Sequence, residues 1–152
     1  MENVLNSGVQ DELCSVQDVI DWLEQVKMLD ELVDAKIAER QQWMELGTKM
    51  TPEMSGMPHA PGVSDKVGNA ASRLGDLITE LDEITDMFID HKQQVINTLE
   101  KLPAEEYGVL HRHYIQYKTL GKVASEMNYS YMQVWRIKEQ GLKRLRTMLG
   151  GE

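Results

Sequence analysis

The chain has 152 residues, enough for one hydrophobic core or two small ones, and its net charge of −9 makes it, as a whole, a poor candidate for binding nucleic acid. Its mean hydropathy of −0.43, without an apolar run of about 18 residues, argues against a membrane span, and its first residues lack a secretion-signal pattern. Cys14 is the single cysteine, which excludes an internal disulfide or a thiolate cluster and fits a reducing cytoplasm.

Residues 1–14 are polar and irregular, and we expect a flexible N-terminus there. The first helix is predicted to begin at Ser15, which suits an N-cap, with Asp18 in its first turn. Neither Gly nor Pro interrupts residues 15–46, where apolar residues recur at helical spacing: Val16, Val19, Leu23, Val26, Leu29, Val33, Ile37 and Met44. Gly47 is expected to end this helix.

Segment 47–63 has the composition of a linker loop, with three prolines and three glycines. A loop that reverses the chain is the simpler interpretation. The alternative is that Met54, Met57 and His59 form an adaptable contact surface, because methionine suits variable packing.

A second helix is predicted from Ser64 to Leu102, with apolar residues at alternating spacings of four and three. This heptad pattern is interrupted by Thr85 and Lys92, and it runs through Val67, Ala71, Leu74, Ile78, Leu81, Phe88, Val95 and Leu99, with Leu77 and Ile84 widening it. Two long helices joined by a short loop predict an antiparallel helical hairpin, which forms a coiled-coil stem over residues 15–102. Because a lone hairpin leaves apolar surface in water, we expect a homo-oligomer, a dimer or larger.

The charge changes sign near the end of this stem. Residues 1–100 hold seven Lys and Arg against twenty Asp and Glu, a balance of −13, whereas residues 101–152 hold nine against five, a balance of +4. A basic C-terminal third on an acidic stem favours contact between that third and nucleic acid.

The sequence pattern of residues 103–150 predicts three helices. Pro103 suits the start of a helix over Ala104–Gln116. Thr119 caps the next helix, and the stretch Leu120–Glu139 has the residue pattern of a helix-turn-helix motif. Its diagnostic positions are Val123 and small Ala124 inside, Met127 as the last anchor, Asn128 at a turn position that needs positive φ, Ser130 as N-cap, and buried Val134 and Ile137. The alternative is an ordinary helical hairpin in a bundle.

The outward face of the last helix then carries Met132, Gln133, Arg136, Glu139, Gln140 and Lys143. Gln pairs with adenine and Arg with guanine, so Gln133 and Arg136 are the predicted base-reading residues. Cations suited to phosphate contact are Lys118, Lys122, Lys143, Arg144 and Arg146, and the DNA-contact set is completed by Ser130, Tyr131, Met132 and Gln140. Trp135 is expected to pack against the first helix of the domain.

An enzyme is disfavoured by the same residues. His111 and His113 are two apart on a helix, so their side chains diverge and cannot chelate one ion. The chain has no Gly-rich phosphate loop, nucleophile elbow or zinc signature, so we expect no catalytic site, metal or cofactor.

From Leu102 to Leu145 the chain resembles region 4 of sigma-70-type transcription factors. The shared residues are Leu102-Pro103, Val109-Leu110, Arg112, Tyr114, Val123-Ala124, Ser130, Val134, Arg136 and Leu145. From Met44 onward it also resembles a family of phage and prophage regulators that join a coiled-coil stem to such a domain, through the segments Ser55-Gly56-Met57-Pro58 and Ser64-Asp65-Lys66-Val67. The resemblance implies promoter DNA, and RNA polymerase as a further partner.

Three positions depart from the region 4 pattern. Tyr117 stands where the family usually has Gly, and Gly121 and Lys122 replace two residues that are usually acidic. A counterpart of the promoter-melting region 2 is also missing, which disfavours a free-standing sigma factor. Two other readings remain beside a cytoplasmic double-stranded-DNA-binding regulator: a protein-interaction module with the stem as scaffold, and a structural phage component with a vestigial motif.

Overall fold

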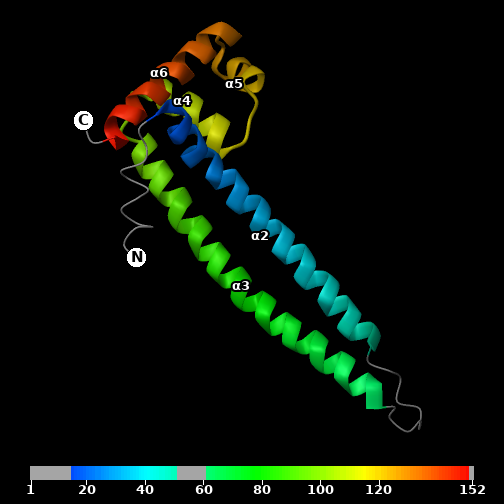
Figure 1. Cartoon of the computed structure of the whole chain (residues 1–152). Coiled ribbons are helices and arrows are strands. Elements are labelled where there is room, and N and C mark those ends of the chain that lie inside the picture. The colour runs from blue at the N-terminus through cyan, green and yellow to red at the C-terminus, as the bar shows by residue number, and fades with distance from the viewer. Residues whose placement is uncertain (1–14, 51–60, 151–152) are drawn as a thin grey trace. The chain divides into compact units, whose positions relative to one another are not determined.

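The computed structural model describes residues 15–50 and 61–150, and the side chains of residues 15–48 and 68–150. These residues form the helices α2 (Val16–Met50), α3 (Pro61–Leu99), α4 (Ala104–Leu110), the π-helix η1 (His111–Ile115), α5 (Leu120–Met127) and α6 (Tyr131–Leu149) (Figure 1). The described part contains no strand, so the predicted all-α class is confirmed. None of its helices is long and apolar enough to cross a membrane. The predicted flexible N-terminus 1–14 and the proposed contact residues Met54, Met57 and His59 lie outside the described residues.

The described chain divides into two compact units. The helix-turn-helix unit consists of residues 15–28 and 89–150, and the hairpin unit consists of residues 29–50 and 61–88. Both α2 and α3 therefore contribute one end to each unit. The helix-turn-helix unit includes stretches, 15–28 and 89–102, that the sequence assigns to the stem rather than to the domain at 103–150.

The N-terminus of α2 is capped as predicted. The Ser15 hydroxyl oxygen accepts a hydrogen bond from the Asp18 backbone N–H at 3.1 Å, and the Asp18 carboxylate accepts one from the Ser15 N–H at 3.0 Å. The two residues thus satisfy two of the backbone donors that a helix start leaves without partners.

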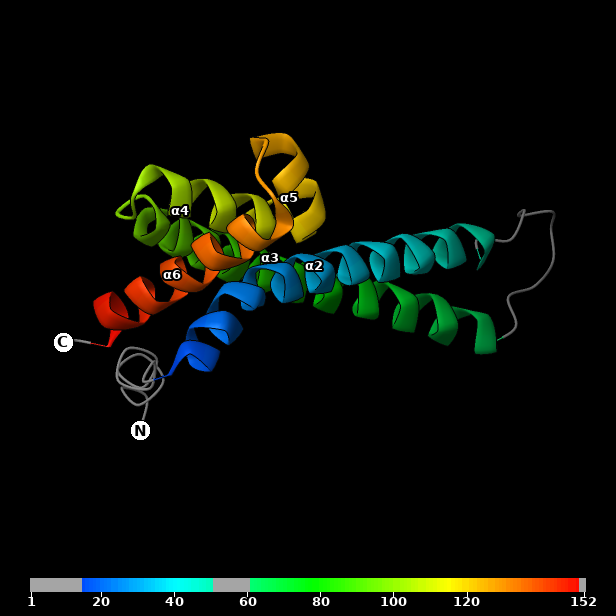
Figure 2. The ribbon, with the colours of Figure 1, turned by 90° about the horizontal axis from the view of Figure 1, so that it is seen from above.

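In the hairpin unit the two helices run antiparallel and side by side (Figure 2). Leu29, Ala70 and Leu77 are buried. An ionic network also crosses between the helices: Lys36 lies 3.0 Å from Glu80, and Arg73 lies 2.8 Å from Glu39 and 3.5 Å from Glu80. The predicted antiparallel hairpin is confirmed.

The helix ends differ from those predicted. Gly47 does not end α2, which continues to Met50, and α3 begins at Pro61 rather than Ser64 and ends at Leu99 rather than Leu102. One glycine costs a helix only about 1 kcal/mol, which a long helix tolerates, and proline is accepted in the first helical turn. The segment between the helices is therefore shorter than the predicted linker 47–63.

The buried line along α3 also differs from the predicted heptad line. Ile78 is 48% exposed, whereas neighbouring Leu77 is fully buried, and Ala70 is buried in place of Ala71. A regular helix repeats every 3.6 residues, so a strict heptad line drifts by about 20° in each repeat. Leu77 and Val95 are both buried, and their spacing corresponds to about five full turns at 3.6 residues per turn, so both side chains lie on the same side of α3.

The helix-turn-helix unit has its own core. A cluster of Val109, Val123, Ala124, Val134 and Ile137 lies where α4, α5 and α6 meet, and α4 and α5 both pack against α6 (Figure 2). Further buried residues from the ends of α2 and α3, and from the rest of the domain, are Val19, Trp22, Leu23, Val26, Val95, Leu99, Leu110, Leu142 and Leu145.

Candidate nucleic-acid interface

The turn between α5 and α6 has the geometry that the sequence predicts. Thr119 caps α5 by accepting a hydrogen bond from the Lys122 N–H at 3.2 Å. Asn128 ends α5 in the left-handed conformation, with φ of 58° and ψ of 40°. Asparagine tolerates this region better than other residues with a side chain, so the positive-φ prediction for Asn128 is confirmed.

The start of α6 is open to solvent and favourable to anions. Ser130 is exposed, and its hydroxyl accepts a hydrogen bond from the Gln133 N–H at 3.1 Å, which confirms the predicted N-cap. The first turn of α6 carries no acidic residue. The partial positive charge of the helix N-terminus is therefore left without a neighbouring carboxylate from its own first turn.

The connection from α4 to α5 departs from the predicted single helix over 104–116. α4 ends at Leu110 and a π-turn follows, in which the Gln116 N–H donates to the His111 carbonyl at 3.0 Å. Tyr117 then adopts a φ of 60°, in the left-handed region that favours glycine. A π-turn inserts one extra residue into a helix. Neither the composition nor the periodicity of this stretch signals it.

Closer to its C-terminus, α6 approaches α4 tightly. Glu106 of α4 is only 6% exposed, and its carboxylate accepts a hydrogen bond from the Arg144 Nε at 2.9 Å. A buried carboxylate is costly unless a charged donor compensates it. Arg144, predicted to contact phosphate, therefore also stabilises the α4–α6 contact, while about half of its side chain (52%) stays exposed.

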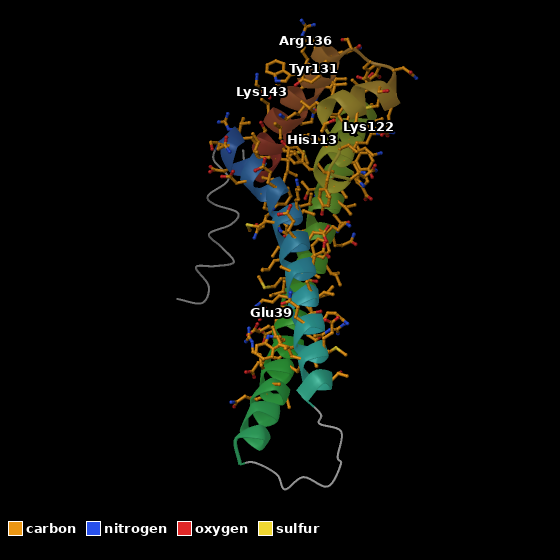
Figure 3. The ribbon with its side chains drawn as sticks, turned by 90° about the vertical axis from the view of Figure 1, so that its right-hand side faces the viewer. Glu39, His113, Lys122, Tyr131, Arg136 and Lys143 are labelled. Atoms are coloured by element: carbon orange, nitrogen blue, oxygen red, sulfur yellow. The ribbon has the colours of Figure 1, made fainter. Side chains whose placement is uncertain are left out.

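The predicted contact residues lie along the solvent side of α6 and at the start of α5. Figure 3 shows Tyr131, Arg136 and Lys143 projecting from α6, and Lys122 from α5. The exposed members of the set are Ser130, Tyr131, Met132, Gln133, Arg136, Gln140, Lys143, Arg144, Arg146 and Lys122.

Lys118, the last of the predicted contact residues, is engaged in an ionic cluster. Its Nζ lies 2.8 Å from a carboxylate oxygen of Glu126, and the Arg112 Nε lies 3.5 Å from the same oxygen. The hydrogen bond from Lys118 lowers the pKa of Glu126. A phosphate bound to Lys118 has to compete with this carboxylate.

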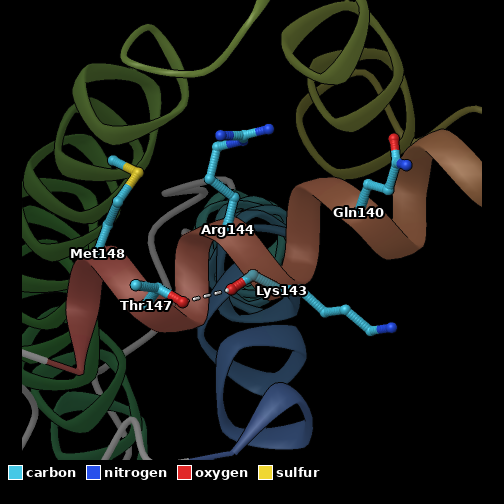
Figure 4. Close-up of a pocket in the computed structure, with 5 residues that line it drawn as sticks. All are labelled: Gln140, Lys143, Arg144, Thr147 and Met148. Carbon is cyan, nitrogen blue, oxygen red and sulfur yellow. Dashed lines mark hydrogen bonds between the residues drawn. The ribbon is translucent and has the colours of Figure 1, made fainter. Parts of the chain in front are cut away.

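A shallow, open hollow of about 440 Å³ lies on the C-terminal half of α6 (Figure 4). Its lining residues are Gln140, Lys143, Arg144, Thr147 and Met148. The Thr147 hydroxyl donates to the Lys143 carbonyl at 3.2 Å and so adds no free donor to the hollow. The two cations make this surface suitable for the phosphate backbone.

Trp135, expected to pack against the first helix of the domain, is partly exposed, and that packing stays a prediction. Trp135 is 42% exposed and does not lie in the core, and Tyr131 and Met132 beside it are 55% and 53% exposed. Val134 and Ile137 already fill the inner side of α6 at this level, so a third large side chain is left outside.

The histidines in the described part of the chain, His91, His111 and His113, make local contacts. His113 Nδ1 lies 2.7 Å from the Lys118 carbonyl oxygen, and His91 Nε2 lies 2.8 Å from that of Trp22. Burial lowers the pKa of His91 and also that of His111. Within the described residues, no three His, Cys, Asp or Glu side chains are grouped so as to hold a metal ion.

Comparison with known proteins agrees with this geometry. The family model of sigma-70, region 4 matches residues 98–147. The chain has no match among curated proteins or among solved structures. The matched segment contains α4, η1, α5 and nearly all of α6, together with the caps and the left-handed turn described above. Residues 98–147 thus form a domain of the sigma-70 region 4 family of helix-turn-helix DNA-binding domains.

Proposed function

We propose that the protein is a cytoplasmic transcriptional regulator of phage or prophage genes that binds double-stranded DNA sequence-specifically, with the N-terminal half of α6 in the major groove. The observation that carries this proposal is the start of α6. It is capped by Ser130, lacks an acidic first turn and exposes Gln133 and Arg136, within a segment that matches a DNA-binding family. Side chains at this end of a recognition helix reach base edges.

The side chains divide between two roles. Gln133 suits a bidentate contact with adenine and Arg136 one with guanine, and each such pair discriminates against a wrong base by about 1–3 kcal/mol. Lys122, Lys143 and Arg144 supply phosphate contacts, which add affinity without sequence information. Lys118 joins them when phosphate displaces Glu126.

Self-association through the hairpin is part of the proposal. Lys36 and Glu39 join the ionic network on one side of the buried line of α2, whereas Ile37 and Met44, seven residues apart, project from the other side. Ile37, Met44 and Ile78 are 42%, 48% and 48% exposed. A second copy that covers such residues would present two recognition helices to neighbouring half-sites.

The oligomer is tested by sedimentation of the full chain. Ile78→Glu is expected to lower the mass to that of one chain, because it places a charge in the covered surface. Met87→Glu is the matched control, since Met87 is 56% exposed and lies on the other flank of α3. A wild-type chain that sediments as a monomer at high concentration would rule out the homo-oligomer.

Fluorescence anisotropy with labelled duplex DNA across a range of salt concentrations tests DNA binding. Lys143→Ala should weaken binding to every duplex and reduce the slope of log affinity against log salt by about 0.9, because one phosphate contact is lost. Lys101→Ala, at an exposed lysine between α3 and α4, should leave the slope unchanged.

The rival function is a protein-interaction module that contacts RNA polymerase or another phage protein, with the hairpin as scaffold. The exposed apolar side chains on α6 favour it, since such groups also suit protein contacts. Failure to bind any duplex at about 50 mM salt, where phosphate contacts are strong, would decide for this rival.

A further inference from the structure

Three large apolar side chains are exposed together at the start of α6. Tyr131, Met132 and Trp135, here called the apolar patch, are 55%, 53% and 42% exposed. Tyr131 and Trp135 are four residues apart and Met132 and Trp135 three apart, so the three adjoin on one surface of the helix. The core does not require them, because the inner side of α6 is filled by Val134, Ile137, Leu142 and Leu145.

The surroundings of the apolar patch point to an anionic partner. Arg136 and Gln133 are exposed beside it, and the first turn of α6 contains no carboxylate. The nearest acidic residue along α6 is Glu139, one turn beyond Trp135. The site therefore needs a ligand that carries negative charge at its rim and an apolar group at its centre.

The major groove of duplex DNA meets both conditions at thymine. Each base pair presents hydrogen-bond donors and acceptors there, and thymine alone adds an apolar group, its 5-methyl. Over guanine or cytosine, the apolar patch would cover polar base edges without giving them a partner, which is unfavourable. Over thymine it removes apolar surface from water on both sides.

We propose that Tyr131, Met132 and Trp135 read thymine methyl groups, and that α6 selects duplexes in which thymines adjoin the base pairs read by Gln133 and Arg136. The inference rests on the proposed DNA-binding function. It assigns a specificity role to Trp135, which carries no charge and is 42% exposed. Gln133 reads adenine by its hydrogen-bond pattern, so the patch and Gln133 recognise opposite members of A·T pairs.

The test uses DNA in which only the methyl group changes. Duplexes that the full chain binds are selected from a pool with a random central segment, and each is made with deoxythymidine or with deoxyuridine, which lacks the 5-methyl. Each contacted methyl should contribute about fourfold in affinity, because burying one such group has roughly that effect. The salt slope should be the same for both duplexes, since the phosphates are unchanged.

Protein variants assign the effect to the apolar patch. Trp135→Ala and Met132→Ala should reduce the difference between the two duplexes, and both variants should fold because the side chains are exposed. Met148→Ala is the matched control: this methionine is 38% exposed on the other half of α6, and its loss should leave the full difference. Far-UV circular dichroism checks the fold of each variant.

Every outcome decides between the alternatives. Equal affinity for thymine and uracil duplexes, with normal salt dependence, overturns the inference and leaves the proposed function standing. Absence of duplex binding at any salt overturns both. If the affinity difference between thymine and uracil duplexes is unchanged in Trp135→Ala and Met132→Ala, the apolar patch does not recognise the methyl groups. Patch variants that lose binding to vesicles containing phosphatidylserine, but bind both duplexes as the wild type does, would assign the patch to a lipid surface.

Discussion

The tight packing of α4 against α6 at Gly141 gives a specific prediction about stability. A Cβ placed on Gly141 would lie 2.8 Å from the Leu110 Cδ1 and 3.4 Å from the Glu106 Cβ. Leu110 is fully buried, so its methyl group has little room to move aside. Overpacking of this kind costs about 1–3 kcal/mol. Alanine favours the helix over glycine by about 1 kcal/mol, so Gly141→Ala should lower the free energy of unfolding by roughly 1 kcal/mol.

Gly121 supplies the matched control. It lies inside α5, and a Cβ there would have no atom within 4 Å. Gly121→Ala therefore gains helix propensity without a clash, and the free energy of unfolding should rise by about 0.5–1 kcal/mol. Both variants replace a helical glycine with alanine, so most of the gain in helix propensity cancels when their free energies of unfolding are compared. Their difference, about 1–3 kcal/mol, then measures the overpacking at Gly141.

Urea denaturation followed by far-UV circular dichroism measures both changes. A common slope of free energy against urea in the wild type and both variants is required, because a changed slope would signal a different unfolding transition. The reasoning is refuted if Gly141→Ala proves as stable as Gly121→Ala. That result would mean that α4 and α6 separate freely at this point.

Three further predictions concern single side chains. Asn128→Ala should destabilise the protein by about 1 kcal/mol in thermal melts, whereas Asn128→Gly should not, because only glycine accepts the left-handed turn without a Cβ penalty. Burial lowers the pKa of His91, and the hydrogen bond to the Trp22 carbonyl offsets only part of this shift. The contribution of His91 to stability is therefore complete above the unfolded value of about 6.5 and is lost as the pH falls through the folded value. His91→Gln should therefore flatten the decrease in urea midpoint on acidification, and an unchanged decrease would contradict this. Glu126→Gln should release Lys118 to phosphate and steepen the salt slope of DNA binding by up to about 0.9; an unchanged slope would show that Lys118 does not reach the duplex.

Local side-chain chemistry made much of the fold predictable. Ser15, Thr119 and Ser130 each satisfy a backbone donor within three residues of themselves, and Asn128 needs only its own tolerance of positive φ. Such interactions depend on neighbours in sequence and are therefore readable from it. The predicted helix-turn-helix followed from these positions and from the small side chain of Ala124.

Features that depend on packing were not predictable in the same way. The π-turn after Leu110 and the exposure of Trp135 result from how many side chains fit between neighbouring helices, which the periodicity of one helix does not specify. Ile78 illustrates the same limit. The heptad pattern predicts that Ile78 is buried and the 3.6-residue period predicts that Leu77 is, and the sequence does not decide between them. For the candidate site, the exposure of Gln133 and Arg136 agreed with the helical wheel.

The acidity of the chain bears on how such a domain achieves specificity. Residues 1–100 carry −13, and some of these carboxylates belong to the helix-turn-helix unit itself, at 15–28 and 89–100. At about 0.1 M salt, charges on the surface are largely screened beyond about 10 Å. The attraction must then come from the few cations that touch phosphate, and Glu106 and Glu126 already hold Arg144 and Lys118. In the proposed function, with so limited a non-specific contribution, short-range contacts from the first turns of α6 have to supply most of the preference for one site. An apolar patch that gains only over thymine methyls adds specificity there without adding affinity for every duplex.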